Sequence, residues 1–153
     1  MAPHAPRILF IGYGNPGRGD DGLGPALADR LEPLANETLT VDSDYQLTVE
    51  NSADVARHDI VIFADATVKG AETYFFREIK PEGSPRLDSH GLDPESVILL
   101  AKAIFGAAPK AYLLGVRGYE FEQFELQLST KAAENLENAL QYVKEFINYS
   151  RSD

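Results

Sequence analysis

The sequence predicts a three-layer α/β sandwich, in which a mostly parallel sheet is flanked by helices on both faces. Short apolar runs, Arg7 to Gly12 (RILFIG) and Ile60 to Ala64 (IVIFA), have the composition of strands buried on both faces. They alternate along the chain with segments whose apolar residues recur every three or four positions, as in amphipathic helices. Alternation of this kind is typical of a sheet covered on both sides by helices.

The first half of the chain supplies three strands and two helices. The strand at residues 7–12 leads through a glycine-rich loop into a helix that we expect to end near Pro33 and Asn36, with an apolar face made of Leu23, Leu27, Leu31 and Leu34. Residues 39–41 predict a brief strand and residues 49–56 a short helix. The strand at residues 60–64 is expected to end at Asp65.

The second half adds two strands and two helices. Residues 74–76 fit an antiparallel edge strand, and residues 80–91 look irregular. Asp93 and Pro94 form a helix-start signal for a helix that runs through Phe105, and residues 111–116 supply another buried strand. Ser129 is expected to cap a long final helix with an apolar face formed by Ala132, Leu136, Ala139, Leu140, Val143, Phe146 and Ile147.

Length and composition limit the possible functions. The 153 residues fit a single domain, 1–153, without repeats or linker composition. The formal charge of −10 disfavours nucleic acid and anionic lipid as partners. The chain has no Cys, which excludes disulfides, thiolate ligands and cysteine nucleophiles, so any metal must bind oxygen or nitrogen. Residues 1–7 lack the apolar stretch of a signal peptide, and no run approaches a membrane span. We expect a soluble, cytoplasmic monomer.

The loop after the first strand admits two interpretations. Residues 12–17 (GYGNPG) match the dinucleotide fingerprint G-x-G-x-x-G, and Asp42 lies at about the right distance for its ribose-binding acid. However, Asp20 and Asp21 already occupy the helix N-terminus where a pyrophosphate would bind. Two like charges at about 4 Å repel by about 4 kcal/mol at an effective dielectric near 20, more than a helix terminus returns. A nucleotide-binding module therefore remains the weaker alternative.

Two adjacent carboxylates exceed what a helix cap needs. One of Asp20 and Asp21 is expected to cap or brace the first helix, which stabilises it by about 1 kcal/mol. The other is then available to a cation or a substrate. We assign capping or bracing to Asp20 and the ligand role to Asp21.

Further polar groups are expected at the carboxyl ends of the strands, where open parallel sheets bind ligands. Asp65 lies there, although an Asp in this position also starts ordinary loops. Among the histidines, His4 is terminal and His58 precedes its strand, whereas His90 lies in a loop that can cover the same crevice. A lone loop His is more often a surface residue. Together, Asp21, Asp65 and His90 would form a set suited to nickel, zinc or iron.

These residues resemble the motifs of the [NiFe]-hydrogenase maturation proteases. The resemblance rests on Asn15 and the Asp20-Asp21-Gly22 run, on Asp65 in FADA and on His90 before GLDPES, and it keeps the motif order over nearly the whole chain. It implies a helix-flanked five-stranded sheet, with Asp21, Asp65 and His90 as metal-binding and catalytic residues. The chain itself contains neither G-x-S-x-G nor HExxH, so serine-hydrolase and zincin chemistry are disfavoured.

The resemblance also implies the activity. Members of the family remove a C-terminal peptide from the hydrogenase large-subunit precursor after nickel insertion, with nickel as the recognition element. This predicts a nickel-guided, aspartate-type endopeptidase whose nickel is carried by the precursor and which uses no organic cofactor. The alternative is a non-catalytic nucleotide- or metal-binding Rossmann-like module.

One segment departs from many relatives, which have a Gly-Gly pair after the second strand. Residues 42–47 read DSDYQL here, and Glu50 follows. This pattern resembles the branch that serves NAD-reducing or bidirectional hydrogenases. Glu50 is expected either to orient substrate or, as is more usual for a helix carboxylate, to be solvated.

Overall fold

The structure, a computed structural model, describes residues 5–70, 72–88 and 91–152 and contains a five-stranded sheet. The strand order is β2-β1-β3-β7-β4. The first four strands are parallel and β4 pairs with β7 in the antiparallel direction, so the predicted mostly parallel sheet with an antiparallel edge is confirmed. The strands are β1 (Ile8–Tyr13), β2 (Leu39–Asp44), β3 (Ile60–Thr67), β4 (Tyr74–Ile79) and β7 (Lys110–Arg117).

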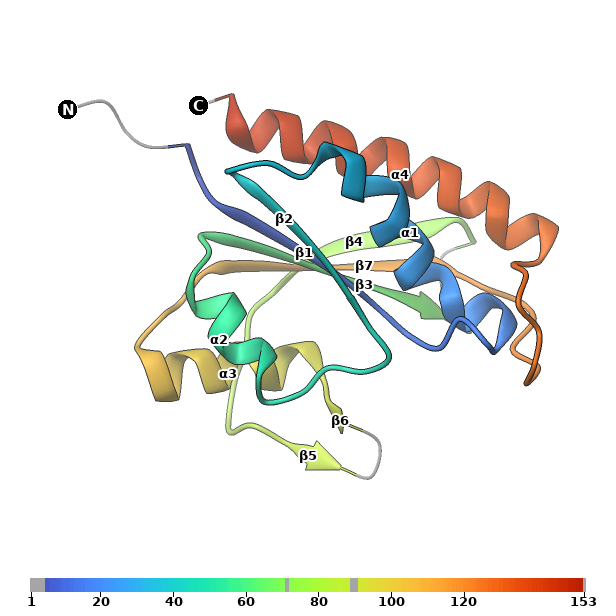
Figure 1. Ribbon diagram of the computed structural model, residues 1–153. Coiled ribbons are helices and arrows are strands. Elements are labelled where there is room, and N and C mark those ends of the chain that lie inside the picture. Colours follow the sequence, from blue (N-terminus) through green and yellow to red (C-terminus); the bar gives the residue numbers. More distant parts are fainter. Residues whose placement is uncertain (1–4, 71, 89–90, 153) are drawn as a thin grey trace.

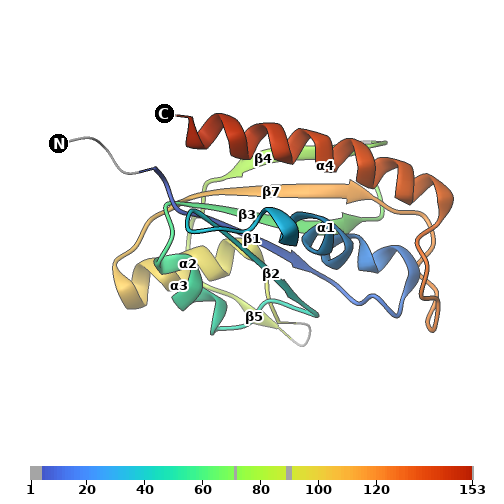
Figure 2. The same ribbon diagram turned by 45° about the horizontal axis from the view of Figure 1, so that its top comes forward.

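Helices cover both faces of the sheet and complete the three predicted layers (Figures 1 and 2). On one face, α1 (Leu23–Leu31) and α4 (Thr130–Arg151) bury their apolar residues against the sheet. On the other face, α2 (Asn51–Ala56) and α3 (Pro94–Phe105) do the same. Residues of β1 alternate between the two cores, since Ile8 and Phe10 face α1 and α4 while Leu9 and Ile11 face α2 and α3. This alternation explains the continuous apolar run.

Two helices begin as the sequence predicts. Asp93 caps α3 by accepting a hydrogen bond from the N–H of Ser96 at 2.7 Å, and Ser129 caps α4 by accepting one from the N–H of Ala132 at 3.2 Å. The α3 helix ends at Gly106, which adopts the left-handed conformation typical of a helix terminus. Among the helices that the structure describes, none has the length and apolar composition required to cross a bilayer.

Several element boundaries differ from the predictions. The first helix continues beyond Leu31 only as the 3-10 turn η2 (Glu32–Leu34), since Pro33 lacks the N–H that an α-helix needs. The β2 strand extends to Asp44 because β1 pairs with it throughout. The segment expected to be irregular contains a short two-stranded ladder, β5 (Leu87–Asp88) with β6 (Gly91–Leu92).

The β3 strand also runs further than predicted, and this affects the site. Its pairing with β1 ends at Ala64, but β7 continues to pair with it through Thr67. Asp65 therefore lies within the strand, opposite Gly115, and not at its end. Beyond Ala64, β3 no longer pairs with β1, so a crevice opens between these two strands at Asp65.

The order of the strands places a ligand crevice between β1 and β3. From β1 the chain crosses to β2 through α1 on one face, whereas from β3 it reaches β7 through α3 on the other face. The two strands thus lie on either side of the point where the connecting helices change from one face of the sheet to the other. Open α/β sheets bind ligands at the carboxyl ends of strands at such a switch point.

Close backbone contact joins β1 to the start of α1. A Cβ added to Gly12 would lie 2.0 Å from the carbonyl oxygen of Gly24, and one added to Gly24 would lie 2.5 Å from that of Tyr13. The residues of the G-x-G-x-x-G match therefore have different roles. Gly14 (φ +142°) needs the backbone freedom of glycine, but Gly17 does not adopt a positive φ.

We expect Gly12→Ala to lower the free energy of unfolding by about 3 kcal/mol, because the clash is with backbone and cannot be relieved by a side-chain rotation. Gly17→Ala is the matched control in the same loop, since its nearest neighbour is the tip of the Asn15 side chain at 3.2 Å. Urea unfolding measures both variants. Equal stability of the two would contradict this account of the β1–α1 contact.

Candidate functional site

A cleft of about 640 Å³ opens at the carboxyl ends of β1 and β3, and both predicted carboxylates line it. Asp21 comes from the 3-10 turn η1 (Gly19–Gly22) before α1, and Asp65 comes from β3. The rest of the lining is drawn from four separate segments of the chain: Tyr13, Gly14 and Arg18, Tyr45 to Leu47, Gly91 to Pro94, and Leu113. Residues far apart in the sequence thus meet at the crevice that the topology creates.

Asp21 is half-buried and held by the loop that precedes it. Its Oδ2 accepts a hydrogen bond from the backbone N–H of Asn15 at 2.8 Å, and the Asn15 side chain in turn accepts one from Gly17 N–H at 2.8 Å. Within the described residues, no other side-chain hydrogen bond reaches the Asp21 carboxylate. The Oδ2 atom of Asp21 is therefore oriented by the protein backbone.

Asp65 is the most perturbed acid of the site. Burial raises its pKa, hydrogen bonds from the N–H of Ala66 and from the hydroxyl of Tyr13 lower it, and the negative charge of Asp21 raises it, with a resulting pKa of about 7. Its Oδ1 accepts the hydrogen bond from Ala66 N–H at 2.8 Å. A carboxyl group with this pKa gains and loses its proton near neutral pH, as acid–base and ligand-binding groups in clefts do.

Tyr13 is a site residue that the sequence analysis missed. Burial, the charge and hydrogen bond of Asp65 and the charge of Asp93 together raise the pKa of Tyr13 well above its usual value, so its hydroxyl stays protonated beside Asp65. The available signal was its place directly after the first strand, between two glycines. We treated this residue only as part of the glycine fingerprint.

Of the two roles predicted for Asp20, capping is wrong, whereas bracing agrees with its contacts. The α1 helix has Gly22 at its N-cap position and no side-chain hydrogen bond to its N-terminus. Asp20 is instead fully buried and binds the segment between β7 and α4. Its carboxylate accepts four hydrogen bonds of 2.7 to 2.9 Å, from the N–H groups of Tyr119, Glu120 and Ser129 and from the Ser129 hydroxyl.

His90 lies outside the residues that the structure describes, so its predicted role as third ligand remains a prediction. The residues that follow it, Gly91 to Asp93, line the cleft. Asp93 is engaged as the cap of α3 and pairs with Arg86 at 3.0 Å. Across residues 5–70, 72–88 and 91–152, no group of three or more His, Cys, Asp or Glu side chains is arranged to bind a metal. Of the three carboxylates that line the described part of the cleft, Asp93 is engaged in this cap and ion pair, and Asp21 and Asp65 are the other two.

The loop that matches the dinucleotide fingerprint has no spare N–H groups for a phosphate. Every backbone N–H from Gly14 to Asp21 donates to an acceptor within the protein, and Pro16 has none to donate. The acceptors are the carbonyl oxygens of Asn15, Arg18, Asp44, Glu120 and Glu125 and the side chains of Asn15 and Asp21. A pyrophosphate at a helix N-terminus needs such N–H groups. The geometry therefore disfavours nucleotide binding here.

Two further acids of the sequence analysis lie outside the cleft lining. Asp42 bonds to the N–H of Ser43 at 2.8 Å, and Glu50 is exposed at the start of α2 without capping it. Neither residue is among those that line the cleft. For Glu50, this exposure agrees with the solvated interpretation.

Solved structures of known function share this fold. HycI, a [NiFe] hydrogenase maturation protease from Thermococcus kodakarensis KOD1, is 25% identical with a TM-score of 0.72, and the alignment covers 94% of each chain. HybD, a hydrogenase maturating endopeptidase from E. coli, is 23% identical with a TM-score of 0.70, over 94% of this chain and 93% of its own. A hydrogenase 2 maturation peptidase from a Thaumarchaeota archaeon is 23% identical with a TM-score of 0.68, over 93% and 98%.

The chain has the fold of the hydrogenase maturation proteases. The resemblance predicted from the motifs is thereby confirmed, including its helix-flanked five-stranded sheet. No protein-family model matches the sequence, and no curated protein does. The branch that serves NAD-reducing or bidirectional hydrogenases remains a prediction from residues 42–47.

The raised pKa of Asp65 predicts how stability depends on pH. The folded protein retains this proton up to about pH 7, whereas an unfolded Asp loses it near 3.8, so burial of Asp65 costs stability increasingly as the pH rises between these values. Asp65→Asn removes the charge. We expect the metal-free variant to melt at a higher temperature than the native protein at pH 8, with a smaller difference at pH 5 that disappears near pH 4. A melting difference that does not change with pH would contradict the assignment.

The hydrogen bonds of Asp20 predict a structural role. Burial raises the pKa of Asp20, but the hydrogen bonds from the three N–H groups and the Ser129 hydroxyl lower it by more. The pKa therefore lies below its usual value, and the carboxylate is charged at neutral pH. Asp20→Asn replaces one acceptor oxygen with an NH₂ group that faces donors, and we expect a loss of about 3 kcal/mol in urea unfolding. The control is Asp29→Asn on the exposed side of α1. A loss no larger than that of the control would overturn the role.

Proposed function

We propose that this protein is an endopeptidase that removes the C-terminal extension of a nickel-loaded [NiFe]-hydrogenase large-subunit precursor. The observation that carries this proposal is the pair of carboxylates, Asp21 and Asp65, that face one cleft at the switch point of a fold shared with hydrogenase maturation proteases. The precursor is the substrate and brings the nickel with it.

The donor chemistry of the site suits a divalent cation. The charge of Asp21 raises the pKa of Asp65, and burial of Asp65 adds to this effect, so the ionised pair is held in an unfavourable arrangement. A cation between the two groups would offset that repulsion and stabilise both as carboxylates. Carboxylate and imidazole ligands suit nickel, zinc or iron, and His90 is the proposed third ligand.

Each group of the chain has a definable part in peptide hydrolysis. The Asn15 N–H orients Asp21, and the Tyr13 hydroxyl and the Ala66 N–H orient Asp65. Asp21 and Asp65, with His90, would bind the nickel of the precursor and so place the adjacent peptide bond in the cleft. A metal beside that bond polarises its carbonyl or activates a water molecule. Asp65 has a pKa of about 7 in the free protein, and the bound cation would hold it ionised as a ligand.

Single replacements of Asp21, Asp65 and His90 by Ala test this proposal. We expect each variant to remain folded and to process nickel-loaded precursor at least about a hundredfold more slowly, because each loses a group that positions the reacting bond. Glu50→Ala is the matched carboxylate control, since Glu50 is exposed and outside the cleft lining, and it should process normally. Cleavage is followed by the mass of the precursor, with and without nickel.

Two results would refute the proposal. Normal processing by all three variants would show that the cleft is not the site of reaction. Tight binding of NAD(P) or flavin, with no cleavage of any nickel-loaded precursor by the native protein, would favour the non-catalytic alternative instead.

A further inference from the structure

Two smaller hollows extend from the cleft along the side of α1. The first, of about 310 Å³, shares Gly14 and Tyr45 with the cleft. The second, of about 380 Å³, shares Pro16, Pro25 and Ser43 with the first and ends at Leu126 and Leu128. The shared lining residues join the three into one groove that leads from the carboxylates to Leu126.

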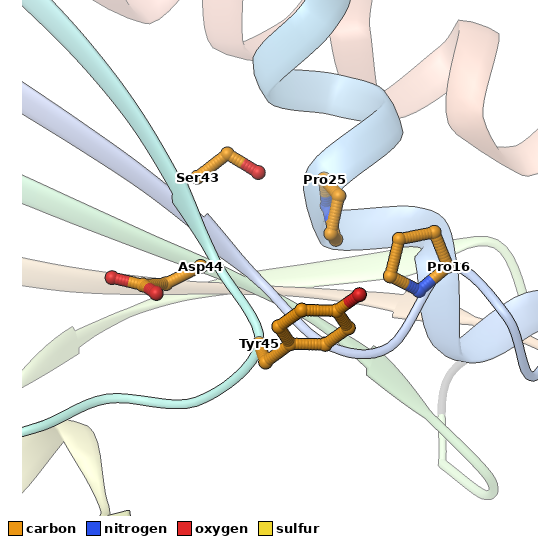
Figure 3. Close-up of a pocket in the computed structure, with 6 residues that line it drawn as sticks. Pro16, Pro25, Ser43, Asp44 and Tyr45 are labelled. Carbon is orange, nitrogen blue, oxygen red and sulfur yellow. The ribbon is translucent and has the colours of Figure 1, made fainter.

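Proline rings and large exposed side chains border this groove beside polar residues. Figure 3 shows Pro16, Pro25 and Tyr45 gathered around the first hollow, with the Ser43 hydroxyl directed toward α1 and Asp44 pointing away. Tyr45 is 69% exposed and Leu126 is 81% exposed, so two large apolar side chains border the groove without being covered by the described protein. Exposed apolar side chains grouped along a hollow are typical of a surface that binds another molecule.

The charges along the groove favour a cationic occupant. Asp44 is the charged residue that lines the first hollow and Asp29 the one that lines the second, and neither hollow has a described Lys or Arg in its lining. The whole chain carries a formal charge of −10. A partner segment that combines apolar side chains with positive charge therefore complements this surface.

The far wall is held in place by the same loop that carries the site. The N–H of Gly19 donates to the Glu125 carbonyl at 2.7 Å, directly before Leu126, and Asp20 binds the chain on both sides of this segment. A wall fixed before binding loses little conformational entropy when a partner docks. Leu126 is thus exposed on a supported segment, and its position relative to Asp21 is set by the backbone between them.

We propose that this groove binds an extended segment of the precursor polypeptide next to the bond that is cut, with apolar side chains of the segment at Tyr45 and Leu126 and its positive charge toward Asp29. The inference rests on the proposed function, because the groove matters for catalysis only if the cleft is the site of cleavage. A row of shallow hollows fits successive side chains of an extended chain better than it fits one compact small molecule.

Leu126→Ser tests the far end of the groove. It removes an exposed apolar contact, so we expect the KM for nickel-loaded precursor to rise about tenfold with kcat unchanged. Leu34→Ser is the matched control, because Leu34 is also an exposed leucine, 46% accessible, and lies outside the groove. Thermal melting checks that both variants are folded.

Ser43→Trp tests the centre of the groove. The exposed Ser43 lines both hollows, and an indole ring there would occupy the space that the precursor segment needs. We expect KM and the dissociation constant of the precursor, measured by calorimetry, to rise tenfold or more, while the melting temperature stays close to that of the native protein.

The outcomes separate the two proposals. If the native protein cleaves the precursor and neither Leu126→Ser nor Ser43→Trp changes KM or the dissociation constant, the groove is not the binding surface and the proposed function stands. If Leu34→Ser raises KM as much as Leu126→Ser does, the groove is likewise refuted. If the native protein cleaves no nickel-loaded precursor, the proposed function fails, and the groove inference fails with it.

Discussion

The buried carboxylate of Asp20 is the interaction on which the arrangement of the site depends. A charge removed from water is tolerated only when hydrogen bonds replace its hydration, and Asp20 accepts four of them. All four come from Tyr119, Glu120 and Ser129, about one hundred positions later in the chain. The loop after β1 is thereby joined to the segment before α4, whose cap is the same Ser129. Asp21, the next residue, takes its position from this anchor.

Adjacent acids thus have opposite functions because their surroundings differ. Asp20 is surrounded by donors, which stabilise its charge. Asp21 faces the cleft together with Asp65, and the negative charge of Asp21 raises the pKa of Asp65. Two like charges held close together lower the free energy of unfolding. A bound cation would remove this cost, and groups perturbed in this way are typical of ligand-binding sites. The electrostatics of the cleft therefore support the proposal that its ligand is a cation.

The sequence predicted the layers and the caps but not the contacts that place the site. Local signals were sufficient for Asp93 and Ser129, because a cap bonds to a residue three positions away. They were insufficient for Asp20, whose partners lie in a distant segment, and adjacency to a helix wrongly suggested a cap. Asp65 was correctly placed at the crevice, but the length of its strand depends on β7, which no local pattern reveals. Tyr13 was missed because its neighbour Asp65 is distant in sequence.

The same anchor joins the proposed binding groove to the cleft. The segment that carries Leu126 and the turn that carries Asp21 are connected through Gly19 and Asp20 by hydrogen bonds of about 2.7 Å. A precursor segment bound at Leu126 would therefore contact a segment that is hydrogen-bonded to the turn that carries Asp21. Since a misplacement of about 1 Å can cost a hundredfold in rate, a shared support that fixes the spacing of Leu126 and Asp21 before the precursor binds favours correct placement of the bond that is cut.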